Sequence, residues 1–588
     1  MPGGLPESAV AALATEVSGD TAQKNLEGIV SFHRERGSRG FHAAATLVAE
    51  RARAYGLAEV EILKFPADGK IFYGTQRSRP AWDAQGAELV EVTDSRRVTI
   101  ASYASEPIVL AEDSESADVT ADLVDVGDGS KEADYAGKDV KGKIVLVATS
   151  PGAAQDLAVG KFGAAGIVSY QQNQKTGWSG DNQDQIRWGH LETFSAHPTF
   201  AFMVSSNTAR ALKERLATGE RIRLHASVKA GQHVAPYEVV TAVIPGADPE
   251  LKGEEIAFSC HLDHQKPGAN DNASGCVTIL EVARTLQKLI SDGSLARPAR
   301  TIRFIWPPEI EGTVTLLNAR PDLAARIKAV VHMDMVGGGP ATQAVFHVTR
   351  GPASLPSFVH DVAWNFAQWV NEQSYQFAAT GKSAYPMLAA GGGKEPLRAE
   401  STAFTMGSDH DVYQDSSFAI PAIYLNDWPD RYIHTNLDAA ANIDATKLGR
   451  VAFIGAASGY ALANDDRVTA DSRIRKAAQA APSQASGEGR LVFMRNGKLR
   501  GPMSVFGYDY FDDHAKSAGM ARPRLLDFEG VRGSGGEYAY EALNFTDGKR
   551  NAQQVCDALS SEFGTVPLDL VVEYLKALEA TGVVTQAP

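Results

Sequence analysis

Hydrophobic residues recur along the chain in two patterns, one typical of strands and the other of helices. Short apolar runs predict strands, and apolar positions three and four residues apart predict helices. After residue 235 the two patterns alternate, with predicted strands at 239–244, 256–260, 302–306, 329–332 and 420–425. Because strands that alternate with helices are typical of a mostly parallel sheet with helices on both faces, we predict an α/β fold for this region.

Other segments of the chain carry different patterns. Residues 41–54 predict a helix and residues 60–65 a strand, and residues 113–122 then become acidic and rich in Ser and Thr. A smaller unit of strands and helices follows up to about residue 230. Residues 466–489 have weak apolar periodicity and favour a linker. Two helices, predicted at 552–563 and 567–581, form a small packed unit near the C-terminus.

Composition and charge limit the kinds of molecule that this chain could bind. The 588 residues are 44% hydrophobic and 22% charged, which is ordinary for a globular protein. The net charge is −14, and the segment 537–588 alone has eight acidic and three basic residues. Since contacts with phosphate groups need clustered Lys and Arg, we expect neither nucleic acid nor an anionic membrane as a partner.

The few cysteines and the short apolar runs exclude disulfide-rich, Cys-rich zinc and membrane-spanning proteins. Only Cys260, Cys276 and Cys556 occur, too few for a disulfide framework or a Cys-rich zinc cluster. No uncharged apolar run reaches the roughly 18 residues of a membrane span. The first residues show no signal peptide, which predicts a cytoplasmic protein if the sequence is full length and a secreted one if it is a processed form.

The most informative stretch is CHLDHQKPGANDNASG at 260–275. His261 ends a predicted strand, and Asp271 lies ten residues later at the start of a predicted helix. Imidazole and carboxylate are ligands of zinc, and one carboxylate can bridge two cations. Asp263 is placed to orient His261. A strand–turn–helix junction capped by Asp and Asn is the alternative, and the PGANDNASG context favours the metal site.

Three further segments offer polar groups in the same region. Asp334 follows a predicted strand, Asp409 and His410 lie in the loop TMGSDH, and His434 lies in RYIHTNLD beside Tyr432. Each segment is a weak signal alone. Together and in this order they indicate one site, with Tyr432 as a candidate wall of a substrate pocket.

These motifs resemble those of the zinc-dependent aminopeptidases, whose fold is shared with glutamate carboxypeptidases and glutaminyl cyclases. An N-terminal segment with Arg34 and the run KGKIVL…GAAGIV at 141–168, which resembles a protease-associated (PA) domain, extend the resemblance over most of the chain. The resemblance implies one zinc ion held by His261, Asp271 and Asp334. It implies a second held by Asp271, His434 and a glutamate, and a glutamate general base that activates a metal-bound water.

One motif departs from the family pattern. The family has Glu-Glu-x-Gly, whereas this chain has Glu309-Ile310-Glu311-Gly312. Alignment on Gly312 gives Glu309 the position of the general base and places Ile310, which cannot ligate, at the position of the metal ligand. Glu311 would reach the second metal only after a shift of the backbone. We therefore expect one or two zinc ions per chain, with the second site weakened.

The resemblance implies a zinc-dependent peptidase that hydrolyses peptide or amide bonds, with an aminopeptidase as the leading hypothesis. Glu309 and Asp263 are the expected catalytic residues, and Asp409, His410 and Tyr432 are expected to orient ligands or substrate. Two alternatives stay open: a degenerate peptidase that acts as a peptide- or protein-binding scaffold, and a glutaminyl-cyclase-like acyl transferase. The large PA-like insertion argues against the cyclase.

The predicted domain order has five parts. They are the N-terminal part of the catalytic domain (1–108), a PA-like insertion (109–232), the metallopeptidase catalytic domain (233–468), a linker (469–489) and a C-terminal module (490–588). The C-terminal module resembles a winged helix and the small leader-binding domains of peptide natural-product pathways. A leader or carrier peptide is therefore its expected partner, beside the peptide substrate of the catalytic domain. Oligomeric state and cleavage preference stay open.

Overall fold

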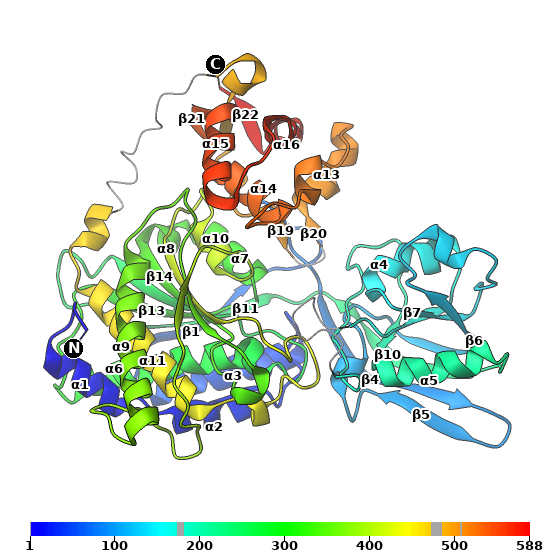
Figure 1. The fold of residues 1–588 in the computed structure, drawn as a ribbon, viewed down its shortest axis with the longest axis horizontal. Helices are drawn as coiled ribbons and strands as arrows, with labels where there is room; N and C mark the ends of the chain where they lie inside the picture. Colours follow the sequence, from blue (N-terminus) through cyan, green and yellow to red (C-terminus); the bar gives the residue numbers. More distant parts are fainter. Residues whose placement is uncertain (1, 173–181, 472–484, 506–507, 588) are drawn as a thin grey trace.

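An eight-stranded sheet organises the largest part of the chain in the computed structural model, which describes residues 2–172, 182–471, 485–505 and 508–587 (Figure 1). Its strands lie in the order β1 (Ala58–Phe65), β11 (Tyr237–Ile244), β13 (Thr301–Trp306), β12 (Glu255–Ser259), β14 (Ile327–Asp334), β17 (Ala422–Asp427), β15 (Phe346–Thr349) and β16 (Glu400–Thr402). The four central strands β13, β12, β14 and β17 are parallel, and β1, β11 and β15 join antiparallel. The predicted α/β fold with its largely parallel sheet is confirmed.

One face of this sheet is covered by helices. They are α1 (Glu7–Glu16), α2 (Gly19–Ile29), α3 (Arg39–Ala54), α6 (Gly275–Ser291), α9 (Val359–Thr380) and α11 (Ala445–Ala463). Their apolar sides and the sheet form one core, in which Phe258 and Phe304 stack with ring centroids 5.2 Å apart. Because α6 begins directly after the segment that carries Asp271, this core fixes the position of that carboxylate.

The opposite face is covered partly by α7 (Glu311–Ala319), α8 (Pro321–Arg326) and α10 (His410–Gln414), and partly by the C-terminal module. A single apolar cluster extends from Val239 and Ile305 of the sheet to Leu559 and Leu575 of the module. Figure 1 shows the module (orange to red) above α7 and α10. The module is therefore packed onto the sheet and shares its core.

The C-terminal module combines helices with a three-stranded sheet. Its elements are β18 (Val492–Arg495), β19 (Ser504–Val505), β20 (Tyr508–Asp509), α13 (Tyr510–Ala518), α14 (Gly535–Asn544), β21 (Asp547–Asn551), α15 (Ala552–Phe563), α16 (Leu568–Ala580) and β22 (Val584–Gln586). Strand β18 lies between β21 and β22. The helices at 552–563 and 568–580 have the expected bounds within one residue, and the winged-helix assignment stays a prediction.

A second sheet of seven strands belongs to the PA-like insertion (blue to cyan in Figure 1). Its order is β5 (Arg97–Ser102), β4 (Ala81–Val92), β10 (Arg223–His233), β6 (Ala117–Gly127), β7 (Ile144–Val147), β8 (Gly166–Ser169) and β9 (Ala201–Met203), with helices α4 (Pro151–Gln155) and α5 (Ser206–Ala217). The sheet begins before the predicted boundary at residue 109, because β4 pairs with β10 along almost its whole length.

The sequence also predicts a linker before the C-terminal module and no membrane-spanning segment. The predicted linker at 469–489 lies largely outside the described residues. Among the helices that the structure describes, none combines the length and the apolar character that crossing a membrane requires.

The shared core of the sheet and the C-terminal module can be tested at Leu559, which is fully buried in it. Leu559→Ala should lower the free energy of unfolding by about 2–5 kcal/mol, because it removes buried methyl groups and leaves a cavity. Calorimetry should show the main transition of the whole chain moving to lower temperature. The control, Leu568→Ala at a partly buried position of the same module, should move it far less. A separate minor transition that alone responds to Leu559→Ala would contradict the shared core.

Candidate metal centre

The candidate ligands lie at the carboxyl ends of the central strands, where ligands bind in open α/β sheets. His261 follows β12, Glu309 follows β13, and Asp334 is the last residue of β14. His434 lies in the loop after β17, and Asp271 lies in the turn that precedes α6. The predicted convergence of these five residues is therefore present in the structure.

The first cluster contains His261, Glu309 and Asp334, whose candidate ligand atoms all lie within 4.8 Å of one another. His261 Nε2 is 3.4 Å from Asp334 Oδ1, 3.9 Å from Glu309 Oε1 and 3.1 Å from Asp271 Oδ1. Among the described residues, His261 Nε2 and Asp334 Oδ1 are buried without a hydrogen-bond partner. Buried polar atoms that converge without hydrogen bonds fit a bound cation.

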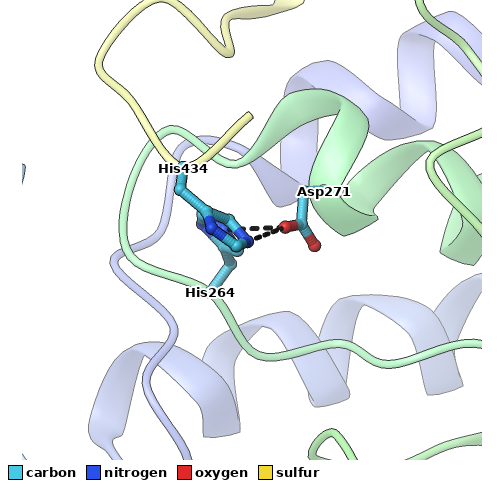
Figure 2. A group of neighbouring side chains, drawn as sticks. All are labelled: His264, Asp271 and His434. Carbon is cyan, nitrogen blue, oxygen red and sulfur yellow. Dashed lines mark ion pairs between the residues drawn. The ribbon is translucent and has the colours of Figure 1, made fainter. Parts of the chain in front are cut away.

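The second cluster contains His264, Asp271 and His434 (Figure 2). Asp271 Oδ2 is 2.8 Å from His434 Nε2 and 3.4 Å from His264 Nε2. Figure 2 shows both imidazoles directed at this carboxylate from the same side. Asp271 thus presents Oδ1 to the first cluster and Oδ2 to the second. This is the arrangement that a carboxylate shared by two cations requires.

His264 is absent from the ligands that we predicted from the sequence. A strand-like pairing with Arg34 places it, since the backbone N–H of each residue donates to the carbonyl of the other at 3.1 Å. The Arg34 guanidinium also donates to three carbonyl groups of the same loop, those of Leu262, Pro267 and Gly268. The available signal was the second histidine of HLDH, together with the buried arginine of the N-terminal motif.

Glu311, the uncertain predicted ligand of the second metal, lies in neither cluster. Its carboxylate faces two buried arginines, with Oε2 3.4 Å from Arg36 Nε and Oε1 accepting a hydrogen bond from Arg79 Nε. The preceding Ile310 adopts a φ of +52° and packs its side chain into the core shared with the C-terminal module. The structure thus places Glu311 in ion pairs with two arginines and in neither cluster, and its uncertain ligand role stays a prediction.

Two carboxylates hold the backbone that presents Glu309. Asp263 Oδ1 accepts a hydrogen bond from the Glu309 N–H at 2.7 Å and lies 3.5 Å from His261 Nδ1. Asp409 Oδ1 accepts one from the Ile310 N–H at 2.8 Å. A positive φ is strained for a β-branched residue, and such strain persists where neighbouring bonds impose it. Asp263 and Asp409 therefore fix the direction of the Glu309 side chain.

Burial and neighbouring charges shift the pKa values of these groups. Burial raises the pKa of Glu309 well above its usual value, although His261 opposes the shift, and burial raises the pKa of Asp409 to about 7. Burial alone would raise the pKa of Asp271, but the facing imidazoles, His264 first, hold it well below its usual value. Burial lowers the pKa of His434 to about 4, which keeps its ring neutral at pH 7, the state that binds metal.

His410 and Tyr432, the two remaining predicted site residues, belong to neither cluster. His410 is fully buried, with its ring stacked 3.9 Å from that of Tyr424 and its Nε2 2.8 Å from the Thr405 carbonyl oxygen. It has no surface to offer a substrate, so any effect on the site passes through packing. Tyr432 is half-buried under the Arg431 guanidinium, and its role at a substrate stays a prediction.

Comparisons with known proteins agree with this geometry. The model of peptidase family M28 matches residues 239–458, and that of the PA domain matches residues 119–212. The PA match therefore lies between β1 and β11, and the M28 match begins within β11. A "Probable leucine aminopeptidase" of Arthroderma benhamiae is 28% identical over 191 residues, which are 30% of this chain and 51% of that protein. The chain therefore spans about half the length of this curated relative.

Two solved structures share the fold. A zinc aminopeptidase from Bacillus subtilis aligns with a TM-score of 0.51 and 17% identity, over 76% of this chain and 95% of its own. A structure from Clostridium acetobutylicum aligns over 98% of both chains with a TM-score of 0.50 and 13% identity. At these identities the likeness concerns the fold alone, and in the second case it includes the C-terminal module.

The substitution Glu311→Gln tests whether Glu311 is an ion-pair partner or a metal ligand. The variant should bind as much zinc as the wild type, because Glu311 faces Arg36 and Arg79 rather than a metal cluster. It should lose about 1.5–3 kcal/mol of stability, since it weakens charged hydrogen bonds to buried arginines. Elemental analysis and denaturant unfolding measure the two effects. The loss of one zinc equivalent without loss of stability would restore Glu311 as a ligand.

Proposed function

We propose that this chain is a zinc-dependent peptidase that removes residues from the N-termini of peptides. The observation that carries the proposal is the position of Asp271, which belongs to the second cluster and also lies 3.1 Å from His261 of the first, the cluster that contains Glu309. The M28 match and the aminopeptidase names of the relatives support peptide hydrolysis.

The donor set fits two zinc ions. His261, Asp271 and Asp334 would hold one ion, and Asp271, His264 and His434 would hold the other. Bound there, zinc supplies Lewis-acid chemistry that polarises a peptide carbonyl and makes water a better nucleophile at neutral pH. Imidazoles and carboxylates are the groups that zinc prefers in hydrolytic sites.

Glu309 is the general base of this proposal. Its carboxylate would take a proton from the attacking water and later deliver it to the leaving amine. Asp263 and Asp409 are positioning residues, because they bond to the backbone at Glu309 and Ile310 and not to a substrate. This arrangement holds the base in one direction before the substrate arrives, which lowers the cost of reaching the transition state.

The two alternatives make different predictions for the product. A non-catalytic scaffold is disfavoured because His264 supplies the donor that Ile310 lacks, so both clusters retain three candidate ligands. A glutaminyl-cyclase-like acyl transferase would convert an N-terminal glutamine into a ring and lose ammonia without shortening the peptide. Mass spectrometry of the products separates this outcome from hydrolysis.

We also propose a leader or carrier peptide as the partner of the C-terminal module. Support comes from β21 and β22, which lie at the two edges of its three-stranded sheet, where an extended peptide can add as a further strand. Deleting the module is a poor test, because the sheet shares its core.

A substitution at the strand edge offers a cleaner test of this partner. The N–H of Ala587 pairs inward with Val492, so alternation directs the N–H of Gln586 outward. Gln586→Pro should reduce kcat/KM for a 20-residue peptide several-fold and leave a dipeptide substrate unchanged. Equal rates of wild type and variant on the long peptide would remove the partner proposal.

The general base can be tested by Glu309→Gln. The variant should lose about 10²–10⁴-fold in kcat/KM and retain its zinc, because the amide cannot accept the proton. The measurement is mass spectrometry of a mixed peptide library with zinc-loaded protein, and Glu372→Gln on the exposed surface of α9 is the matched control. Turnover close to that of the wild type would overturn the role of Glu309. Equal cleavage of N-acetylated and free peptides would overturn the aminopeptidase assignment.

A further inference from the structure

A segment of the PA insertion, residues 185–190, reaches the second cluster. The indole of Trp188 lies nearly parallel to both imidazoles, with its centroid 3.7 Å from that of His434 and 4.8 Å from that of His264. The interplanar angles are 18° and 20°. His190 packs edge-on against the same indole at 4.6 Å. A single aromatic side chain of the inserted domain therefore covers both histidines of the cluster.

The backbone of this segment pairs with the loop that carries His434. The Trp188 N–H donates to the His434 carbonyl at 2.9 Å, and the Asn436 N–H donates to the Ile186 carbonyl at 3.0 Å. His434 adopts a φ of +59°, a conformation that costs energy for a residue other than glycine. The paired segment thus holds the ligand loop in a conformation that the loop would not favour alone.

The same segment also contacts the loop of His264. Gln265 Nε2 donates to the Gly189 carbonyl at 3.0 Å. His264 Nδ1 lies 2.6 Å from the Gln265 carbonyl oxygen, which places its proton on Nδ1 and leaves Nε2 directed at Asp271. Both imidazoles of the cluster are therefore oriented by bonds that involve or adjoin residues 185–190.

A buried ion pair joins the PA insertion to the N-terminal part of the chain. Glu112 of the insertion lies 2.7 Å from His190 Nδ1 and pairs with Arg36, which lies 3.4 Å from Glu311. Burial alone would raise the pKa of Glu112, but Arg36 and His190 hold it well below its usual value. The insertion is thus held by a charged contact close to the segment that carries Trp188.

We propose that the PA insertion completes the second metal site, with Trp188 as the positioning residue for His264 and His434. This inference rests on the proposed metal centre and assigns the insertion a part in building it. Ile310 stands where the family pattern has a carboxylate ligand, so the site depends on two imidazoles carried by loops. Stacking removes the freedom of both rings to turn away, which preorganises them for the cation.

The test is a zinc titration of the full chain after chelation, followed by calorimetry, for wild type, Trp188→Ala and Trp188→Phe. Wild type should bind two equivalents. Trp188→Ala should keep the first and bind the second about 10–100-fold more weakly, the usual effect of losing a residue that orients a ligand. Trp188→Phe should stay within about threefold of wild type, since a phenyl ring also stacks. Trp364→Ala on α9, where the indole packs against the helical core, is the control and should bind as wild type does.

Other results of the zinc titration would overturn either this proposal or the proposed function. An unchanged second equivalent in Trp188→Ala overturns the proposal, and so does an equal loss from both sites, which would indicate general damage to the fold. A loss in Trp188→Phe as large as in Trp188→Ala also overturns it. A protein that shows the expected zinc pattern but cleaves no peptide would overturn the proposed function and leave the role of Trp188 standing.

Discussion

The carboxylate of Asp271 lies between His261 on one side and the pair His264 and His434 on the other. Because both clusters use this one group, every other ligand has to be placed relative to it. Asp438 holds the backbone that carries this carboxylate. It accepts hydrogen bonds from the backbone N–H of Asn270 at 2.6 Å and of Asp271 at 3.0 Å. Three imidazoles face this carboxylate and give it polar contacts, without which its burial would be costly.

Each part of the molecule supports a different side of this centre. The helical core holds α6 and with it Asp271. The C-terminal module packs around Ile310, and the hydroxyl of Tyr540 donates to the Asp411 carbonyl at 2.7 Å, beside the loop of Asp409. The PA insertion reaches the remaining side through Trp188. The PA insertion thus contacts the two histidines of the second cluster, and the C-terminal module shares an apolar cluster with Ile310, the residue next to Glu309.

Much of this was predictable from the sequence, because strand ends and short motifs are local signals. The five strands predicted between residues 239 and 425 and the helix at 552–563 are present, whereas β15 and β16 were not predicted. His261 and Asp334 meet because parallel strands end at one edge. His264 was not predicted, since a contact with Arg34, far away in the sequence, places it. Glu311 was predicted only as an uncertain ligand, and its contacts with Arg36 and Arg79, far away in the sequence, could not be predicted. Trp188 was missed because nothing local ties the insertion to the His434 loop.

We propose that Asp271 bridges two cations and that His264 is a ligand of the second cation. A crystal structure of the zinc-loaded protein, with anomalous scattering recorded at the zinc edge, tests it most directly. We expect two peaks about 3.5–4 Å apart on either side of Asp271, with His264 Nε2 bound to the one nearer His434. A single peak between His261 and Asp334, or a second peak with His264 turned away, would contradict it.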